Sequence, residues 1–199
     1  MSGILKVGGS ELINDNGGSG SLQWGTGVPA GSIVQTKFVH FDGVQTIGDG
    51  SSTGTTFVNI GLGVSGQEFS IDMSVSSGNK ILGFGVIQHS ANERYCAIKI
   101  YSDSTQIATH GSVVGNRTNV SASSQYNSNV TNDGYILKNL VFQFDHTPSD
   151  TSSHTYSVKG GNTYVAGSEF VINKMYNDGD NGVYIHRGYS HFMLMEVAQ

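Results

Sequence analysis

Ten short stretches of this chain have the residue content of β-strands, with turn-forming residues between them. They are rich in Val, Ile, Phe, Tyr and Thr, and Gly, Asn, Asp and Ser bound them. Glycine makes up 28 of the 199 residues, too many for long helices, and apolar residues seldom recur at helical spacing. The pattern predicts an all-β sandwich or barrel. The predicted strands are residues 33–41, 56–64, 68–75, 80–88, 96–101, 106–109, 135–145, 154–158, 169–176 and 191–197.

Two of these stretches indicate different surroundings for their two faces. Residues 69–75 (FSIDMSV) alternate apolar and polar side chains, so we expect one face to be buried and the other to be wet. Residues 81–87 (ILGFGVI) are apolar on both faces and place glycines where side chains would crowd. That pattern is typical of a strand covered on both sides, and the second cover is either the other sheet or a neighbouring subunit.

The segment 141–160 predicts a strand, a turn and a second strand. Pro148 fixes its own φ, and Thr147, Ser149 and Asp150 can hydrogen-bond the nearby backbone where a strand ladder stops. We therefore expect a hairpin-like unit around this proline.

The chain is expected to form one domain, residues 32–199, preceded by a lead-in, residues 1–31. The lead-in contains glycine-rich tracts that cannot hold a packed core. Trp24 is the only tryptophan, and so thin a segment offers little to bury it. We therefore expect Leu22 and Trp24 to bury against the main domain or another copy of the chain.

Composition excludes several classes of function. Charged residues are only 13% of the chain, against a norm of about 25%, and the net charge is −5. Without a cluster of Lys and Arg, nucleic acid is not an expected partner. The sequence has no run of about 18 apolar residues, so no membrane insertion is expected, and residues 1–10 lack the features of a secretory signal. Cys96 is the only cysteine and is predicted to be a small core residue.

Two glycine-rich motifs match catalytic or cofactor-binding patterns in sequence but lack the predicted secondary structure that these patterns require. Residues 61–66 (GLGVSG) fit a dinucleotide-binding fingerprint, but a strand rather than a helix is predicted to follow. Residues 50–54 (GSSTG) fit a nucleophile elbow, but they lie in a Gly/Ser/Thr loop. No cofactor and no catalytic residues are predicted.

Residues 177–182 (NDGDNG) admit two interpretations. Asn-Gly between strands is a strong turn signal, whereas the carboxylates could also bind Ca²⁺, although the spacing misses that of an EF-hand. His186 and His191 are five residues apart, which would place them on opposite faces of one strand. No metal site is therefore predicted.

The region around this turn is the predicted ligand-binding surface. Aromatic faces beside amide and charged groups are features that sugar-binding patches use, while the alternative is ordinary packing of tyrosines at a strand end. The candidate ligand-binding residues are Tyr176, Asp178, Asp180, Tyr184, Arg187 and Tyr189.

The whole chain resembles the short virion-structural and tail-fibre-like proteins of marine and cyanobacterial bacteriophages. The resemblance rests on the order and spacing of seven short segments. These are residues 1–7 (MSGILKV), 29–35 (PAGSIVQ), 76–82 (SSGNKIL), 103–107 (DSTQI), 151–156 (TSSHTY), 187–190 (RGYS) and 195–197 (MEV).

This resemblance implies a jelly-roll type of β-sandwich that associates as a homotrimer on a phage particle, without known chemistry. The expected function is the head of a tail or side fibre that contacts the host cell surface, with other virion proteins and a host surface glycan as partners. A capsid-decorating protein (a cement or head-fibre protein), in which Leu22 and Trp24 contact the virus particle, is the second alternative. A fibre-borne polysaccharide depolymerase, which would need convergent carboxylates in a groove, is the third.

Overall fold

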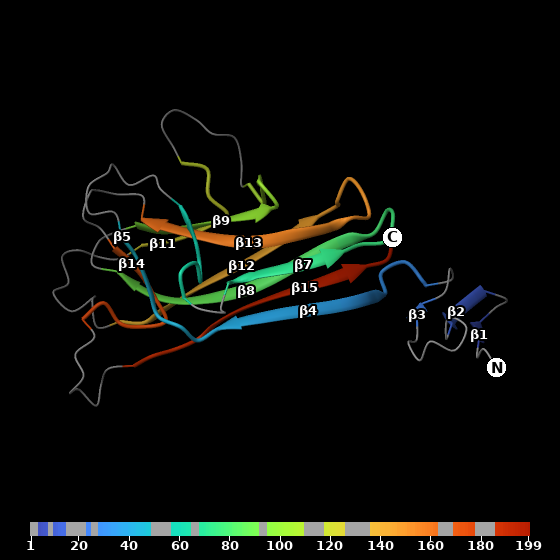
Figure 1. Cartoon of the computed structure of the whole chain (residues 1–199), viewed down its shortest axis with the longest axis horizontal. Helices are drawn as coiled ribbons and strands as arrows, with labels where there is room; N and C mark the ends of the chain where they lie inside the picture. The colour runs from blue at the N-terminus through green and yellow to red at the C-terminus, as the bar shows by residue number, and fades with distance from the viewer. Residues whose placement is uncertain are drawn as a thin grey trace.

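The chain folds into antiparallel β-sheets, two of which stack face to face as a β-sandwich, while a small third sheet lies beyond one end (Figure 1). This computed structural model describes residues 4–7, 10–14, 23–24, 28–48, 57–64, 68–91, 95–109, 118–125, 136–162, 169–177 and 186–199, with the backbone alone before residue 28 and at residues 125 and 162. The described residues contain no helix, and hence none long and apolar enough to cross a membrane. The all-β prediction is confirmed.

The first layer, here named the β8 sheet, is four strands wide. Its strands are β4 (Ile33–Phe41), β5 (Gln45–Gly48), β8 (Lys80–Ala91), β12 (Lys138–His146), β14 (Glu169–Ile172) and β15 (Ser190–Val197). β14 and β15 follow one another along one edge of β8, and β12 pairs with the other edge. β4 pairs with β15 and β5 pairs with β14, so that β12 and the β4–β5 pair form the two outer edges.

The second layer, the β13 sheet, is built in the same way. Its strands are β6 (Val58–Asn59), β7 (Ser70–Ser74), β9 (Tyr95–Ser102), β10 (Thr105–Ile107), β11 (Ala122–Gln125) and β13 (Ser153–Asn162). β13 and β9 are the central pair. β6 and β7 follow one another along the free edge of β13, and β10 and β11 do so along the free edge of β9.

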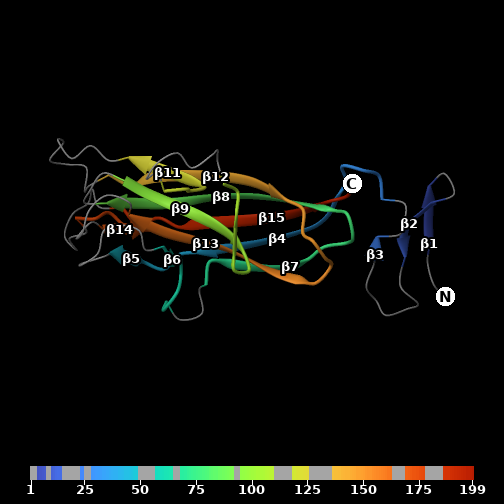
Figure 2. The same cartoon turned by 90° about the horizontal axis from the view of Figure 1, so that it is seen from above.

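The third sheet lies within the predicted lead-in. It consists of β1 (Ile4–Val7), β2 (Ser10–Asn14) and β3 (Gln23–Trp24), in that order. Figures 1 and 2 both place it beyond the end of the sandwich at which β4 begins. Among the described residues it shares no strand pairing with the sandwich, and the boundary at residue 31 stays a prediction.

Most predicted strands are present, but one is largely a turn. Of the predicted strand 56–64, only β6 is extended among the described residues, because the chain turns at Gly61 and Gly63, whose φ angles are +86° and +82°. These are left-handed conformations that glycine adopts without strain. The predicted strand 169–176 stops at Ile172. The sequence did not predict β2, β5 and β11.

The prediction of a hairpin-like unit around Pro148 is wrong. β12 and β13 flank this proline, but β12 pairs with β8 in one layer and β13 pairs with β9 in the other. The loop between them therefore crosses from one sheet to the other instead of closing a hairpin. The reason is long-range: each strand has a partner distant in sequence that buries its apolar side.

The core lies between the two sheets and centres on the ring of Phe192. This ring lies 5.7 Å from that of Phe142 and 6.2 Å from that of Phe144 in its own sheet, and 5.9 Å from that of Phe69, next to β7. Cys96 is fully buried in the same core, as predicted. Such aromatic clusters contribute both buried area and ring–ring contact.

Two glycines of β8 are required by the phenylalanines of β12. Gly83 pairs with Phe144 and Gly85 with Phe142, and the rings cover the glycines. A Cβ on Gly83 would lie 2.1 Å from the Phe144 ring, and one on Gly85 would lie 2.2 Å from the Phe142 ring. The prediction that side chains would crowd at these positions is confirmed.

Asn173 joins the two halves of the β14–β15 edge. It is fully buried in the left-handed conformation, with φ +62°, just after β14 ends. Its backbone N–H donates to the carbonyl of Gln88 at 2.8 Å, and its own carbonyl accepts from the N–H of Gly188 at 3.0 Å. The chain can therefore leave β14 and return as β15 along the same edge of β8.

The Asn173 side chain also ties this junction to β4. Its Nδ2 donates to the carbonyl oxygens of Phe41 at 2.6 Å and Gly43 at 2.9 Å. Its Oδ1 accepts from the Ser190 hydroxyl at 2.7 Å, and the Ser190 oxygen accepts from the N–H of Gln88 at 3.1 Å. One amide thus links β4, β8 and β15 at a single buried point.

Glu196, near the opposite end of β15, accepts hydrogen bonds from three neighbouring residues. It is 1% exposed, and its carboxylate accepts hydrogen bonds from Gln35 Nε2 at 2.6 Å, Asn79 Nδ2 at 2.6 Å and the Ser76 N–H at 2.8 Å. Burial alone would raise the pKa of this carboxyl, but the hydrogen bonds outweigh it and the pKa is lowered.

Candidate functional site

The solvent side of the β8 sheet is rich in apolar side chains. Along β8 the inward residues alternate with Leu82, Phe84 and Val86 on the outside, and along β15 they alternate with Met193 and Met195. We name this surface the apolar face. Its apolar members are Ile33, Phe38, Leu82, Phe84, Val86, Val141, Met193, Met195 and Val197.

Strand register arranges the apolar face in rows that cross all four strands. In the central row Phe38 pairs with Met193, Met193 with Phe84, and Phe84 with Gln143. Phe38 is 74% exposed and Phe84 36% exposed; in the next row Val141 is 67% exposed. Large apolar side chains therefore meet solvent side by side across the sheet, instead of being scattered singly.

The outer face of the β13 sheet has the opposite character. The Lys99 ammonium lies 4.4 Å from the centre of the Phe57 ring, and the Lys159 ammonium lies 4.1 Å from that of Tyr101. Outward polar residues are the rule for both outer faces of a sandwich. The β13 sheet follows this rule and the β8 sheet departs from it. The apolar face therefore has the composition that is typical of interaction surfaces.

A pocket of about 640 Å³ opens at the β12 end of the central row. Phe84 and Gln143 contribute to it from the apolar face, and Ala108 and Thr109 contribute from the segment after β10. We name it the β12 pocket. It is lined by Leu82, Phe84, Ala108, Thr109, Gln143, Phe144 and Asp145.

The charged groups at this corner of the apolar face neutralise one another. Lys80 Nζ lies 3.2 Å from Asp145 Oδ2. At the opposite edge of the apolar face, His40 and His191 form a directly paired position across β4 and β15, one row from Phe38. The apolar face thus carries paired charge at its edge and aromatic or aliphatic groups at its centre.

The predicted contact region adjoins this face through one residue. Tyr189 is 59% exposed, and its ring lies 6.3 Å from that of His191. Arg187 forms an isolated β-bridge with Lys174, two residues before Tyr176. Asp178, Asp180 and Tyr184 lie outside the described residues, so the contact surface as a whole stays a prediction.

The other predicted contact pair is described only in part. Leu22 lies outside the described residues, and Trp24 is the last residue of β3, where its backbone pairs with that of Ile13. Their contact with another copy or a particle stays a prediction.

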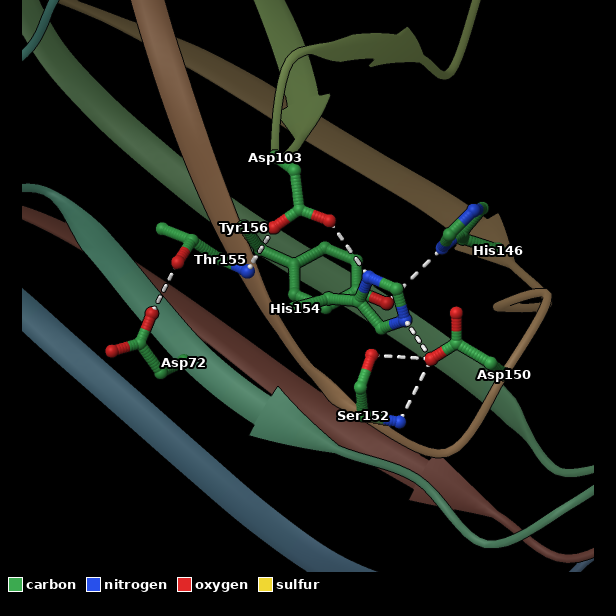
Figure 3. Close-up of polar contacts among 8 residues, drawn as sticks. All are labelled: Asp72, Asp103, His146, Asp150, Ser152, His154, Thr155 and Tyr156. Atoms are coloured by element: carbon green, nitrogen blue, oxygen red, sulfur yellow. Dashed lines mark hydrogen bonds and ion pairs between the residues drawn. The ribbon is translucent and has the colours of Figure 1, made fainter.

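A second cluster surrounds His154 at one end of the β13 sheet (Figure 3). Asp103, in the β9–β10 turn with φ +54°, accepts from the Thr155 N–H at 2.8 Å and lies 2.7 Å from His154 Nδ1 through its other oxygen. His154 Nε2 lies 3.3 Å from Asp150 Oδ1, which also accepts from the N–H of Ser152 at 2.8 Å. The imidazole is therefore flanked by two carboxylates.

This arrangement favours a charged, structural histidine. The hydrogen bond that His154 donates to Asp103 raises the pKa of His154. The hydrogen bond from the Thr155 N–H, followed by that from His154, lowers the pKa of Asp103. With both ring nitrogens directed at carboxylates, the ring presents neither nitrogen to a substrate. The cluster holds the turn and the loop that connects β12 to β13.

A half-buried histidine contacts a buried tyrosine beneath this cluster. His146 Nδ1 lies 3.1 Å from the Tyr156 hydroxyl, and Tyr156 is fully buried. Burial raises the pKa of Tyr156 to about 12 and lowers the pKa of His146. Both groups are neutral near pH 7, which suits a core contact between the two layers.

We expect Asp103→Asn to lower the pKa of His154 toward its ordinary value of 6.5, because it removes the negative partner that raises it. Since the folded pKa is raised, the ion pair stabilises the fold fully below pH 6.5 and is lost as pH rises through the folded pKa. An NMR titration of the histidine ring protons measures this. Asp72→Asn is the matched control, because Asp72 accepts from the Thr155 hydroxyl at 2.6 Å. An unchanged His154 pKa in the Asp103 variant would contradict the assignment.

The described residues contain no group of three or more His, Cys, Asp or Glu side chains placed to hold a metal ion. No protein-family model matches the chain, and no curated protein matches it.

The sequence prediction of contact residues missed the apolar face. A signal was present in residues 192–195 (FMLM), which are apolar at consecutive positions and so on both faces of a strand, as in residues 81–87. Phe38 gave no such signal, because only the pairing of β4 with β15 places it in line with Met193 and Phe84.

Proposed function

We propose that the chain is a bacteriophage virion structural protein, the homotrimeric head of a tail or side fibre that contacts the host cell surface. The resemblance of seven short segments to phage proteins supports the viral assignment. The observation that carries the proposal is the contrast between the two outer faces of the sandwich, one polar and one apolar. A binding protein that assembles from copies needs both kinds of surface.

We further propose that the sandwich is a jelly roll. Each pair of short strands that share an edge, such as β4 with β5 or β14 with β15, counts as one interrupted strand, which gives eight strands along the chain. Numbered in chain order, their arrangement is 1-8-3-6 in the β8 sheet and 2-7-4-5 in the β13 sheet. This interleaved order supports the proposal, and jelly rolls recur in viral capsid and lectin domains.

The two ends of the sandwich suit different tasks. The Gly31 N–H donates to the Ala198 carbonyl at 2.8 Å, so the sandwich begins and ends beside the lead-in. Tyr189 precedes β15, whose eight residues span about 26 Å, so it lies at the opposite end. In the proposed fibre head the lead-in joins the particle, while the end that carries Tyr189 and Arg187 faces the host.

The host-contact role is tested by binding. Labelled protein is incubated with a panel of marine bacterial and cyanobacterial cells and with their extracted surface polysaccharide. We expect saturable binding that Tyr189→Ala reduces at least several-fold, while Tyr95→Ala, an exposed tyrosine on the polar outer face, does not. Absence of binding to every cell type and polysaccharide would overturn the attachment role.

A capsid-decorating protein is the second candidate, favoured by the separate β1–β3 sheet that ends in Trp24. Such a sheet could dock on a shell. Antibody labelling of intact particles in the electron microscope distinguishes the two, since a decorating protein covers the head lattice in many copies. Loss of chain length in the incubated polysaccharide would instead favour the depolymerase.

A further inference from the structure

One row of the apolar face carries a projection at one edge and a pocket at the other. Phe38 lies on β4, is 74% exposed, and occupies the first position of the central row. Phe84 and Gln143, at the far end of the same row, line the β12 pocket. Three inter-strand spacings separate the two edges, which is about 14 Å.

We propose that Phe38 of one copy of the chain inserts into the β12 pocket of a neighbouring copy, and that three copies close into a ring with their apolar faces turned inward. This inference rests on the proposed homotrimer and names its interface. The pocket has room for a phenyl ring, and its lining by Leu82, Phe84 and Phe144 matches the ring chemically.

The charge of the apolar face favours a second copy as the occupant. A nucleic acid or an anionic surface would require unpaired cations, but Lys80 is paired with Asp145 at 3.2 Å. A face with no net charge can meet its own copy without repulsion. Its exposed Phe and Met side chains are types that are enriched in interfaces between proteins.

The size of the apolar face sets how much surface a ring can bury. Four strands are about 19 Å across, and eight residues are about 26 Å long, which gives a footprint of about 500 Å² per copy. Ring closure brings three such footprints together, about 1,500 Å² in the whole ring and about 500 Å² for each pair of neighbours, so each contact depends on closure of the complete ring.

The positions of projection and pocket favour a ring. They lie on opposite edges of the same face, β4 and β12, so each copy offers one to each neighbour. Such head-to-tail contacts close into a ring when the rotation between copies allows it. With the strands along the axis, the β4 edge of each copy meets the β12 edge of the next.

The first test removes the projection. Phe38→Asp should lower the mass in solution threefold, to the 21.1 kDa of one chain, as measured by light scattering after size exclusion. Folding should be retained because the side chain is exposed. Leu62→Asp, at an apolar residue that is 52% exposed in a turn outside the apolar face, is the matched control and should leave the trimer intact. A monomeric wild type, or a Phe38→Asp variant of wild-type mass, would overturn the proposal.

The second test links the two partners covalently. In the double variant Phe38→Cys and Gln143→Cys, complete oxidation should give a covalent trimer on a non-reducing gel, while each single variant stays at the mass of one chain. Cys96 does not interfere, because it is buried and burial raises the pKa of its thiol. A covalent dimer as the end product would overturn the ring, and cross-linking of the Phe38→Cys variant alone would overturn the projection-into-pocket contact.

These outcomes are separate from the test of host binding. A wild-type trimer that binds no cell or polysaccharide would overturn the attachment role and leave the interface intact. A monomeric protein that still binds the cells would do the reverse.

Discussion

Asn173→Ala is expected to lower the free energy of unfolding by about 4 kcal/mol or more. The variant leaves the carbonyl groups of Phe41 and Gly43 and the hydroxyl of Ser190 without their amide partner at a buried site. Each unsatisfied buried group costs about 1–3 kcal/mol. Alanine also tolerates the left-handed backbone at this position less well than asparagine, by about 1 kcal/mol. Urea denaturation of the purified protein measures the change.

Two further variants separate these causes. Asn173→Gly removes the same hydrogen bonds but accepts the left-handed conformation, so it should be more stable than the alanine variant by about 1 kcal/mol. Asn173→Asp keeps an oxygen toward Ser190 but loses both donor hydrogens, so it should also be strongly destabilised. If the alanine variant lost less than about 1 kcal/mol, the junction would not hold the sheet together as described.

Acid is expected to destabilise the fold mainly through His89. This residue is fully buried, with its ring edge-on to that of Phe170 at 5.1 Å, and burial followed by the nearby charge of Lys138 lowers its pKa from 6.5 to about 3. Because the folded pKa is depressed, the contribution is present above pH 6.5 and is lost as pH falls toward the folded pKa. At about 1.4 kcal/mol for each pH unit, about 3 kcal/mol should be lost between pH 6.5 and 4.5.

His89→Leu tests this assignment. Leucine is apolar, close to histidine in volume and not titratable, so the variant should fold at pH 7 and lose most of the slope of stability against pH between 6.5 and 4.5. The pKa of Glu196 is lowered from its ordinary value of 4.5, so this carboxyl does not titrate between pH 6.5 and 4.5. His146, whose pKa burial also lowers, adds slope of the same sign, so each variant is compared with the wild type. A slope unchanged in His89→Leu would contradict the prediction.

The strands were predictable from the sequence where the cause is local. Residues 33–41 form a strand with the predicted bounds, and β15 differs from its prediction by one residue, because alternation and β-branched content act over neighbouring positions. The partner of each strand was not predictable in the same way. Pro148 correctly marked a break, but whether the chain then turns back or crosses to the other layer depends on β8 and β9, which are far away in sequence.

The candidate site was predictable only in outline. Residues 81–87 indicated a strand covered on both sides. In the single chain the other sheet covers only the inner side of this strand, and Phe84 on its outer side is exposed. That a neighbouring subunit covers the outer side stays a prediction. The role of Asn173 was not predictable either, because the sequence predicted a strand that continues to residue 176. A single polar residue in the sequence does not reveal that five hydrogen-bond partners, three of them on β4, β8 and β15, converge on it.

The meeting of Gly31 with Ala198 has a practical consequence for imaging. A fluorescent protein fused after Gln199 would emerge beside the lead-in, since the Ala198 N–H also donates to the Ser32 carbonyl at 2.9 Å. Such a reporter would crowd whatever the lead-in joins and leave the distal end unobstructed. A small dye on a cysteine at position 189 would mark that distal end instead, because the buried thiol of Cys96 would not react with the dye.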